Sequence, residues 1–342
     1  METIKRTKIS VAVITYNQES TIRQTLDSIL AQKGDFDLEV IVGEDCSKDS
    51  TGTICDEIAN RVNSEELIGK SVRVLHTPKN LGIMANFARV IVACTGDYIA
   101  DIAGDDFYCD DDALAKQLAY MQSHPEVGVL AANGYSYYIQ RNEKVPGLNP
   151  EMDAEQKILK DYYFSPTHLE GVYLAPVGMM YRGDVFREYI DLDEILRRKL
   201  PVEDFPIQAI LSQHTKFACL PDLIVTYRVY KESASFMSYN HPRYLEYYRG
   251  LIETRRYLNE LFPDDAVSET ILQERMFYKE WQYDVYHLKY REAKELIASA
   301  SPLVMESESF KNAKRYTRCW LQFAAYNVYK KIMIKRNISK QI

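Results

Sequence analysis

The sequence lacks the patterns of several common protein classes. Its six cysteines, at positions 46, 55, 94, 109, 219 and 319, include no CxxC pair and no cysteine–histidine metal spacing. We therefore expect reduced thiols in a cytoplasmic protein rather than a disulfide framework or a zinc site. No apolar run approaches the ~20 residues that a membrane-spanning helix needs. The run "VAVIT" near the N-terminus is too short for the core of a signal peptide.

Glycine is also scarce, with 14 residues among 342. No GxGxxG follows a predicted strand, which excludes a dinucleotide-dependent dehydrogenase. The segment "TYNQES", which follows the first predicted strand, contains no glycine, so a sugar nucleotidyltransferase with its glycine-rich phosphate loop is excluded too. No fixed-period repeat is present, which excludes a solenoid.

Acidic residues are absent from the C-terminal tail. Residues 311–342 contain nine of the 42 basic residues, which leaves 33 for the first 310 positions against all 49 acidic ones. An acidic body argues against nucleic-acid binding. The tail interleaves its cations with aromatic residues, which fits contact with a membrane surface over 311–340. It fits equally well a helix packed on the protein or on a second subunit, so a homo-oligomer stays open.

Strands and helices alternate over the first 140 residues. Apolar runs predict strands at 8–15, 38–45, 72–77, 97–103 and 127–132, with amphipathic segments between them predicting helices. This alternation is typical of an α/β fold whose mainly parallel sheet is flanked by helices on both faces.

The strand pattern ends near residue 235. We therefore expect one domain over 1–235 and a helical C-terminal region over 236–342. Within that region, the apolar spacing predicts three helices, at 242–262, 267–300 and 308–335.

Three acidic clusters stand beside these elements. Asp45 follows the second predicted strand, Asp105–Asp106 follow the fourth, and Glu203–Asp204 precede an apolar helix. Since ligands bind outside the carboxyl ends of the strands in such sheets, the first two clusters should share one crevice. Each cluster also has a purely structural interpretation, because carboxylates at such places shape turns and cap helices.

The same residue types fit a cation site and a general base. Mg²⁺ or Mn²⁺ binds one or two carboxylates and shares its other positions with water and substrate phosphates, which suits Asp105–Asp106. Partial burial lifts the proton affinity of a carboxylate, which is what a general base at Glu203–Asp204 requires. Asp45 can accept an N–H from a base or a hydroxyl from a ribose.

Five segments, in order and spacing, resemble the motifs of family 2 glycosyltransferases of the GT-A fold. They are "ISVAVITYNQESTIRQTLDSILAQ", "VIVGEDCSKDST", "NLGIMANFARVIVACTGDYIADIAGDDFY", "VEDFPIQAIL" and "LIVTYRVYKESAS". The resemblance implies that 1–235 is a catalytic domain moving a sugar from a nucleotide diphosphate sugar to an acceptor hydroxyl, with inversion. It also implies a glycan or lipid-linked acceptor in bacterial surface polysaccharide assembly, at the inner face of the cell membrane if the tail reaches it.

The resemblance implies a role for each motif residue. The predicted nucleotide-binding residues are Thr15, Tyr16, Asn17, Glu19, Asp45, Gly82, Asn86 and Asp105. Asp45 would contact the edge of the base, which favours a UDP- or dTDP-sugar. Asp105 and Asp106 would bind the metal, and Asp204, with Glu203 beside it, would be the catalytic base.

One position departs from the family pattern, because Ala103 stands where the first aspartate of the DxD motif is expected. The alternative hypothesis is therefore a catalytically impaired relative that binds nucleotide sugars as a binding or scaffold module. Asp105 and Asp204 are intact, which favours the enzyme. Acceptor recognition is expected within residues 134–200, with the helical C-terminal region as a second candidate.

Overall fold

The computed structural model describes residues 6–65, 68–149, 174–230 and 239–341. These residues form two compact units, of which the first ends at Val229. The second holds Tyr230 and the residues from Tyr239 onward. The predicted domain boundary at residue 235, and part of the segment expected to recognise the acceptor, lie outside the described residues.

The first unit is built on one mixed sheet. The strands that the structure describes run in the order β3-β2-β1-β4-β8-β6-β9-β5, with β7 paired to β6. Strands β1 to β4 pair in parallel, whereas β8 is antiparallel to both β4 and β6. The bounds are β1 Lys8–Thr15, β2 Asp37–Glu44, β3 Lys70–Leu75, β4 Tyr98–Ala103, β5 Phe107–Tyr108, β6 Val127–Tyr138, β7 Glu143–Pro146, β8 Met180–Arg182 and β9 Lys216–Val229.

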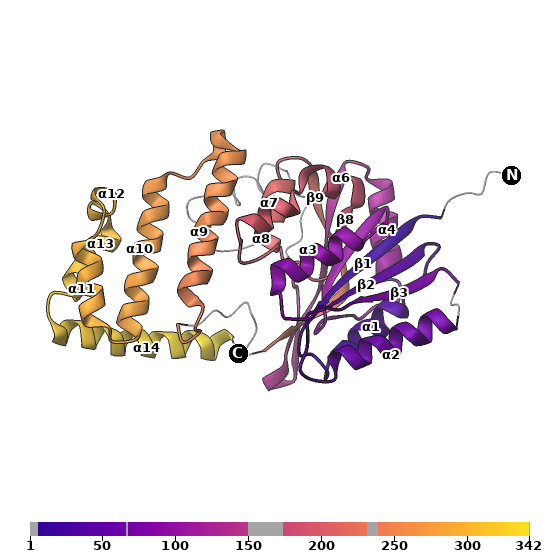
Figure 1. Ribbon diagram of the computed structural model, residues 1–342, viewed down its shortest axis with the longest axis horizontal. Coiled ribbons are helices and arrows are strands. Elements are labelled where there is room, and N and C mark those ends of the chain that lie inside the picture. Colours follow the sequence, from indigo (N-terminus) through magenta and orange to yellow (C-terminus); the bar gives the residue numbers. More distant parts are fainter. Residues whose placement is uncertain (1–5, 66–67, 150–173, 231–238, 342) are drawn as a thin grey trace. The chain divides into compact units, whose positions relative to one another are not determined.

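Helices lie on both faces of this sheet, with α1 and α2 on the face opposite α3 (Figure 1). Parallel strands covered on both faces must be apolar throughout, and in β1 both Val11 and its neighbour Ala12 are buried. The predicted α/β fold is confirmed. The helices are α1 Ile22–Leu30, α2 Thr51–Ser64, α3 Ile83–Ala93, α4 Ala113–Ser123, α6 Gly183–Tyr189, α7 Leu192–Arg197 and α8 Asp204–Leu211, with the 3-10 turn η1 Ile139–Arg141.

The second unit is helical in the part that the structure describes. Its core surrounds Trp281, which is fully buried together with Phe323. Tyrosines also belong to the interior, since Tyr244 is buried and stacks on Tyr283 with 5.7 Å between ring centroids. The elements are α9 Tyr244–Leu261, η2 Pro263–Asp265, α10 Glu269–Tyr286, α11 Tyr290–Ala298, α12 Pro302–Met305, α13 Glu308–Tyr316 and α14 Trp320–Gln341.

Two of the three helices predicted for this unit are interrupted. The segment 267–300 breaks after α10, where Leu288 adopts a left-handed φ of 57°. The segment 308–335 breaks between α13 and α14, where the Thr317 hydroxyl accepts a hydrogen bond of 2.9 Å from the Trp281 indole. Both breaks let shorter helices pack around Trp281, a tertiary effect that helical spacing cannot indicate.

Candidate functional site

The carboxyl ends of β1, β2 and β4 lie side by side at one edge of the sheet. Thr15 pairs with Glu44 of β2, and Ile14 pairs with Ala103 of β4. Beyond the strands, the Asp45 N–H donates to the Thr15 carbonyl at 3.1 Å, and the Gly104 N–H donates to the Ile14 carbonyl at 2.9 Å. The loops after these three strands therefore meet, as the first two acidic clusters predicted.

The loop after β1 is fastened to the loop after β2. The Asn17 amide oxygen accepts from the Lys48 N–H at 2.8 Å, and the Glu19 carboxylate accepts from the Ser50 N–H at 2.9 Å. Asn17 has a left-handed φ of 53°, a conformation that asparagine tolerates better than most residues. The side chains of Asn17 and Glu19 thus shape the rim, while Tyr16 is exposed beside them.

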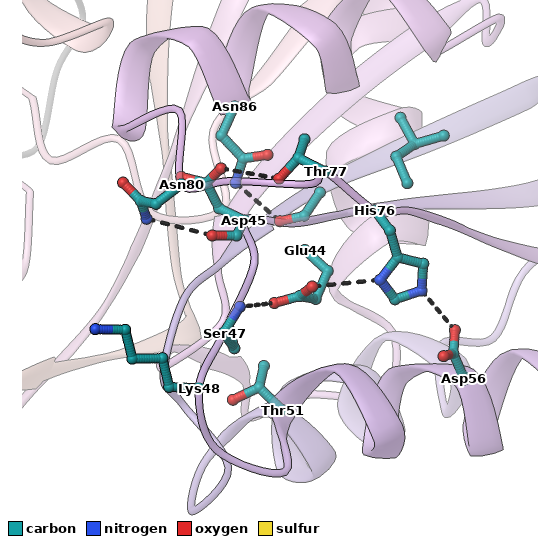
Figure 2. Close-up of polar contacts among 12 residues, drawn as sticks. Glu44, Asp45, Ser47, Lys48, Thr51, Asp56, His76, Thr77, Asn80 and Asn86 are labelled. Atoms are coloured by element: carbon teal, nitrogen blue, oxygen red, sulfur yellow. Dashed lines mark hydrogen bonds and ion pairs between the residues drawn. The ribbon is translucent and has the colours of Figure 1, made fainter.

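Asp45 does not present its carboxylate to the crevice. Its side chain is 2% exposed, and its two oxygens accept from the Leu81 N–H at 2.8 Å and the Gly82 N–H at 2.9 Å. Figure 2 shows Asp45 turned toward Thr77 and the start of α3, with Asn80 donating to its backbone carbonyl. Both carboxylate oxygens thus accept from backbone amides, which favours a structural role for Asp45, and its contact with a base edge stays a prediction.

Asn86 is also an internal residue. It is 3% exposed, donates to the Gly43 carbonyl at 2.8 Å, and accepts from the Arg89 guanidinium at 2.9 Å. The Asn86 amide thus links α3 to β2, and its contact with the nucleotide stays a prediction. Gly82, by contrast, has a φ of 87° and open space where a side chain would lie, so a ligand can approach its backbone.

A short polar chain supports the loop after β2 from behind. His76 lies between Glu44, at 3.3 Å, and Asp56, at 2.9 Å (Figure 2). The hydrogen bond with Asp56 raises the pKa of His76. Burial opposes ionisation of Glu44, but hydrogen bonds from Ser47 and His76 outweigh it and lower its pKa. These hydrogen bonds fix the loop after β2. They leave no free carboxylate directed into the crevice.

A tight turn after β4 carries the second cluster. A side chain at Gly104 would meet the Gln18 carboxamide oxygen at 2.5 Å and the Thr15 hydroxyl at 2.8 Å, so only glycine fits there. The Thr25 hydroxyl of α1 holds the turn through the carbonyls of Gly104, at 3.0 Å, and Asp106, at 2.6 Å. This turn is consequently a rigid part of the sheet edge.

The two aspartates of this turn have different surroundings. Asp106 is 1% exposed and accepts a hydrogen bond of 2.7 Å from the Arg228 N–H of β9. The Arg228 guanidinium donates to the Asp105 carbonyl and lies over the Phe107 ring. Asp105 keeps a partly exposed side chain next to Gln18, and burial raises its pKa. Asp106 therefore links the turn after β4 to β9 through one of its oxygens, and its role as a metal ligand stays a prediction.

Glu203 and Asp204 lie at the start of α8. Burial raises the pKa of Asp204 to about 6, although the Phe205 N–H donates to its carboxylate at 2.7 Å and opposes the shift. Burial and then the charge of Asp204 raise the pKa of Glu203 to about 8. Near neutral pH, Asp204 is the carboxylate of this pair that is mostly ionised.

Residues 10–190 match the model of the family described as Glycosyl transferase family 2. The chain belongs to this family. Among its relatives, the uncharacterised protein Rv1520 of Mycobacterium tuberculosis is 28% identical over 237 residues, which cover 69% of this chain and 62% of that protein. The uncharacterised glycosyltransferase EpsJ of Bacillus subtilis is 26% identical over 152 residues, covering 44% of this chain and 40% of EpsJ. The chain thus spans less than two thirds of these relatives.

Solved structures of other proteins share the fold of this family 2 chain. S. aureus TarS 1–349 in complex with UDP-GlcNAc is similar with a TM-score of 0.53 at 16% identity, covering 95% of this chain and 91% of that one. The mannosyltransferase PcManGT of Pyrobaculum calidifontis, in complex with GDP-Man and Mn²⁺, gives a TM-score of 0.50 at 13% identity, covering 96% and 89%. At these identities the likeness is one of fold.

The family 2 site contains one carboxylate suited to a divalent cation. No group of three or more histidine, cysteine, aspartate or glutamate side chains that could hold a metal occurs among the described residues. Asp105 alone combines a partly exposed carboxylate with a rigid turn at the sheet edge. This donor set fits a cation that takes most of its ligands from substrate phosphates and water.

Asp101 of β4 is a site residue that the sequence analysis missed. Its Oδ1 is buried and has no hydrogen-bond partner in the part of the chain that the structure describes. Burial, then the charges of Glu203 and Asp204, raise its pKa well above the usual value. Asp101, on the strand that leads to Asp105, therefore lies within electrostatic range of the α8 carboxylates. The sequence does contain a sign of this residue, because Asp101 interrupts the apolar run of the strand predicted at 97–103.

Proposed function

We propose that this protein is an inverting, metal-dependent glycosyltransferase that moves a sugar from a nucleotide diphosphate sugar to an acceptor hydroxyl. One observation carries the proposal. Asp101 lies four positions before Asp105 in the same stretch of chain, and its pKa responds to the charges of Glu203 and Asp204. This influence supports a site that a cation ligand and a carboxylate pair with raised pKa values would share, which is the arrangement the reaction needs.

The donor would lie across the carboxyl ends of the strands. Tyr16 and the backbone at Gly82 border the open part of the crevice and would contact the nucleotide. Asn17, Glu19, Asp45 and Asn86 would act indirectly, by fixing the loops on which this surface depends. Asp105 would hold Mg²⁺ or Mn²⁺, which when bound offsets negative charge on the departing diphosphate.

Asp204 would be the catalytic base. With a pKa of about 6 it is ionised at neutral pH, yet basic enough to take a proton from a hydroxyl during attack. The acceptor oxygen forms its bond to the anomeric carbon as the bond from that carbon to the diphosphate breaks, and the hydroxyl proton moves to Asp204. Attack on the face opposite the leaving group inverts the anomeric centre. General-base catalysis of this kind typically contributes about 10²–10⁴ in rate.

The donor we propose is a UDP- or dTDP-sugar. Asp45 no longer supports this choice, since its carboxylate is occupied by backbone amides. The choice is supported by the fold shared with TarS, a protein crystallised with UDP-GlcNAc. Because PcManGT has the same fold and its solved structure is a complex with GDP-Man, GDP-sugars must also be tested as donors. We further propose a glycan or lipid-linked acceptor in bacterial surface polysaccharide assembly, and a reducing compartment, because the six cysteines are free.

A two-stage experiment tests the proposal. Thermal unfolding is followed with UDP, dTDP, GDP and their common sugars, each with and without Mn²⁺, to find the donor. Release of free nucleotide diphosphate from that donor is then measured. A nucleotide sugar that raises the midpoint and is cleaved supports an enzyme, whereas a stabilising donor that is never cleaved supports the binding-module alternative. Ala103 is the feature that favours this alternative.

A further inference from the structure

Helix α14 presents an apolar stripe outward from the helical unit. Leu321, Val328 and Ile332 recur at the spacing of one helix face and are 74%, 57% and 48% exposed. Trp320 and Tyr329 are each 54% exposed beside them. Soluble surfaces carry scattered apolar residues, but a row of this kind along one helix is typical of a docking surface.

The orientation of this stripe is fixed by the opposite face of the helix. Phe323 is fully buried in the core around Trp281, and Asn327 is 3% exposed. The Asn327 amide donates to the carbonyls of Val285, at 2.6 Å, and Tyr286, at 2.9 Å, which end α10. Figure 1 shows α14 lying across the ends of the neighbouring helices, all of which are on one side of it. Rotating α14 to bury the stripe would therefore expose Phe323 and break the hydrogen bonds that Asn327 donates to the end of α10.

Basic residues flank the stripe. Lys314, Arg315 and Arg318 are exposed just before α14, and the helix continues through positions 335, 336 and 340, which are all lysine or arginine. Residues 311–342 hold nine cations and no anion, in a chain whose net charge is −7. No helix in the described part of the chain is long and apolar enough to cross a membrane.

We propose that α14 binds the surface of an anionic lipid bilayer, with Leu321, Val328 and Ile332 immersed among the acyl chains and the basic residues facing lipid headgroups. An exposed apolar stripe bordered by lysine and arginine is the composition of an interfacial helix. Clusters of roughly four to eight such cations favour anionic lipids. Tryptophan and tyrosine, here Trp320 and Tyr329, are the aromatics that prefer the level of the headgroups. This surface belongs to the helical unit, and the inference does not rest on the proposed function.

The test is flotation of the full chain with phosphatidylcholine vesicles and with vesicles that also contain phosphatidylglycerol. We expect binding to the anionic vesicles only, weakened by high salt because screening reduces charge attraction. A variant with Leu321→Gln, Val328→Gln and Ile332→Gln should bind at least about tenfold more weakly, since apolar insertion is lost. A matched control changes three exposed apolar residues outside the tail to glutamine, namely Val92, Leu303 and Met305, and should bind like wild type.

Fluorescence gives a second measurement that does not depend on the triple variant. Trp320 is exposed and Trp281 is fully buried, so a blue shift on adding anionic vesicles should vanish in Trp320→Phe. Wild-type flotation equal with and without phosphatidylglycerol, or no flotation at all, would overturn the proposal. So would self-association in sedimentation that the triple variant abolishes while vesicles bind neither protein, because the stripe would then join two copies. Thermal stabilisation by the donor stays unchanged in every variant, which keeps this test independent of catalysis.

Discussion

The backbone N–H of Arg228 donates to the Asp106 carboxylate at 2.7 Å, across 122 positions of the sequence. This bond joins the end of β9 to the turn after β4 and leaves Asp105 as the aspartate of the pair with a partly exposed side chain. The two adjacent carboxylates therefore have separate tasks. One holds the turn, and the other is available to a cation.

Asp105→Asn and Asp106→Asn should consequently affect different properties of the protein, the first metal-dependent binding and the second stability. Asp105→Asn should remove the dependence of nucleotide diphosphate affinity on Mn²⁺ and leave the free energy of unfolding nearly unchanged. Asp106→Asn should lower the free energy of unfolding by roughly 1–3 kcal/mol, because the amide introduces a buried NH2 donor beside the Arg228 N–H. Calorimetric titration with and without Mn²⁺ and urea denaturation measure the two quantities. Loss of the Mn²⁺ effect in a fully stable Asp106→Asn protein would reverse the assignment.

Asp45→Asn should act on stability rather than on recognition of the base. The side-chain NH2 group of the asparagine would face a backbone N–H donor, that of Leu81 or that of Gly82, and could not accept its hydrogen bond. These two N–H groups hold the start of α3. We expect a loss of roughly 1.5–3 kcal/mol in the free energy of unfolding. The ratio of affinities for UDP and GDP should stay at its wild-type value. A changed ratio would return Asp45 to the role of a base-contacting residue.

The raised pKa of Asp101 predicts how the free energy of unfolding depends on pH. Its folded pKa is raised well above the ordinary value near 3.9, so the unfolded chain releases this proton at a lower pH than the folded protein does. Wild-type stability is therefore lost as the pH rises above about 4, until the folded pKa is reached. Asp101→Asn removes this titration, so the free energy of unfolding of the variant should rise relative to that of wild type as the pH increases from 5 to 8.

Denaturation with urea at both pH values measures this gain. Asp264→Asn, at an exposed position, is the control and should follow wild type. An Asp101→Asn variant that loses stability at pH 8 would mean that the carboxylate is ionised and satisfied in the folded protein.

The sequence allowed the strands, the helices over them and the location of the acidic clusters to be predicted. Strand periodicity and the parallel arrangement are local or topological properties, and they placed Asp45 and Asp105 at the same edge. The orientation of each carboxylate was not predictable, because it depends on donors far along the chain. Asp45 binds amides 36 and 37 positions away, and Asp106 binds one at 122.

The helical unit illustrates the same limit. An apolar spacing over 308–335 predicts one helix. The structure instead has two helices, α13 and α14, and Thr317 between them accepts a hydrogen bond from the Trp281 indole. Asp101 was missed for a related reason. It occupies an apolar strand without a local motif, and its significance comes from α8 carboxylates about one hundred positions later.

The most direct test of the proposed chemistry is the pH profile of nucleotide diphosphate release, measured with saturating donor for wild type, Asp204→Asn and Glu203→Gln. Wild-type release should rise with pH through an apparent pKa near 6, because Asp204 acts in its ionised form. Asp204→Asn should bind the donor with unchanged affinity and release nucleotide about 10²–10⁴ times more slowly, without the rise through this pKa. Glu203→Gln should keep most of the activity, since Glu203 is already largely protonated at neutral pH. Release by Asp204→Asn at close to the wild-type rate would contradict the account.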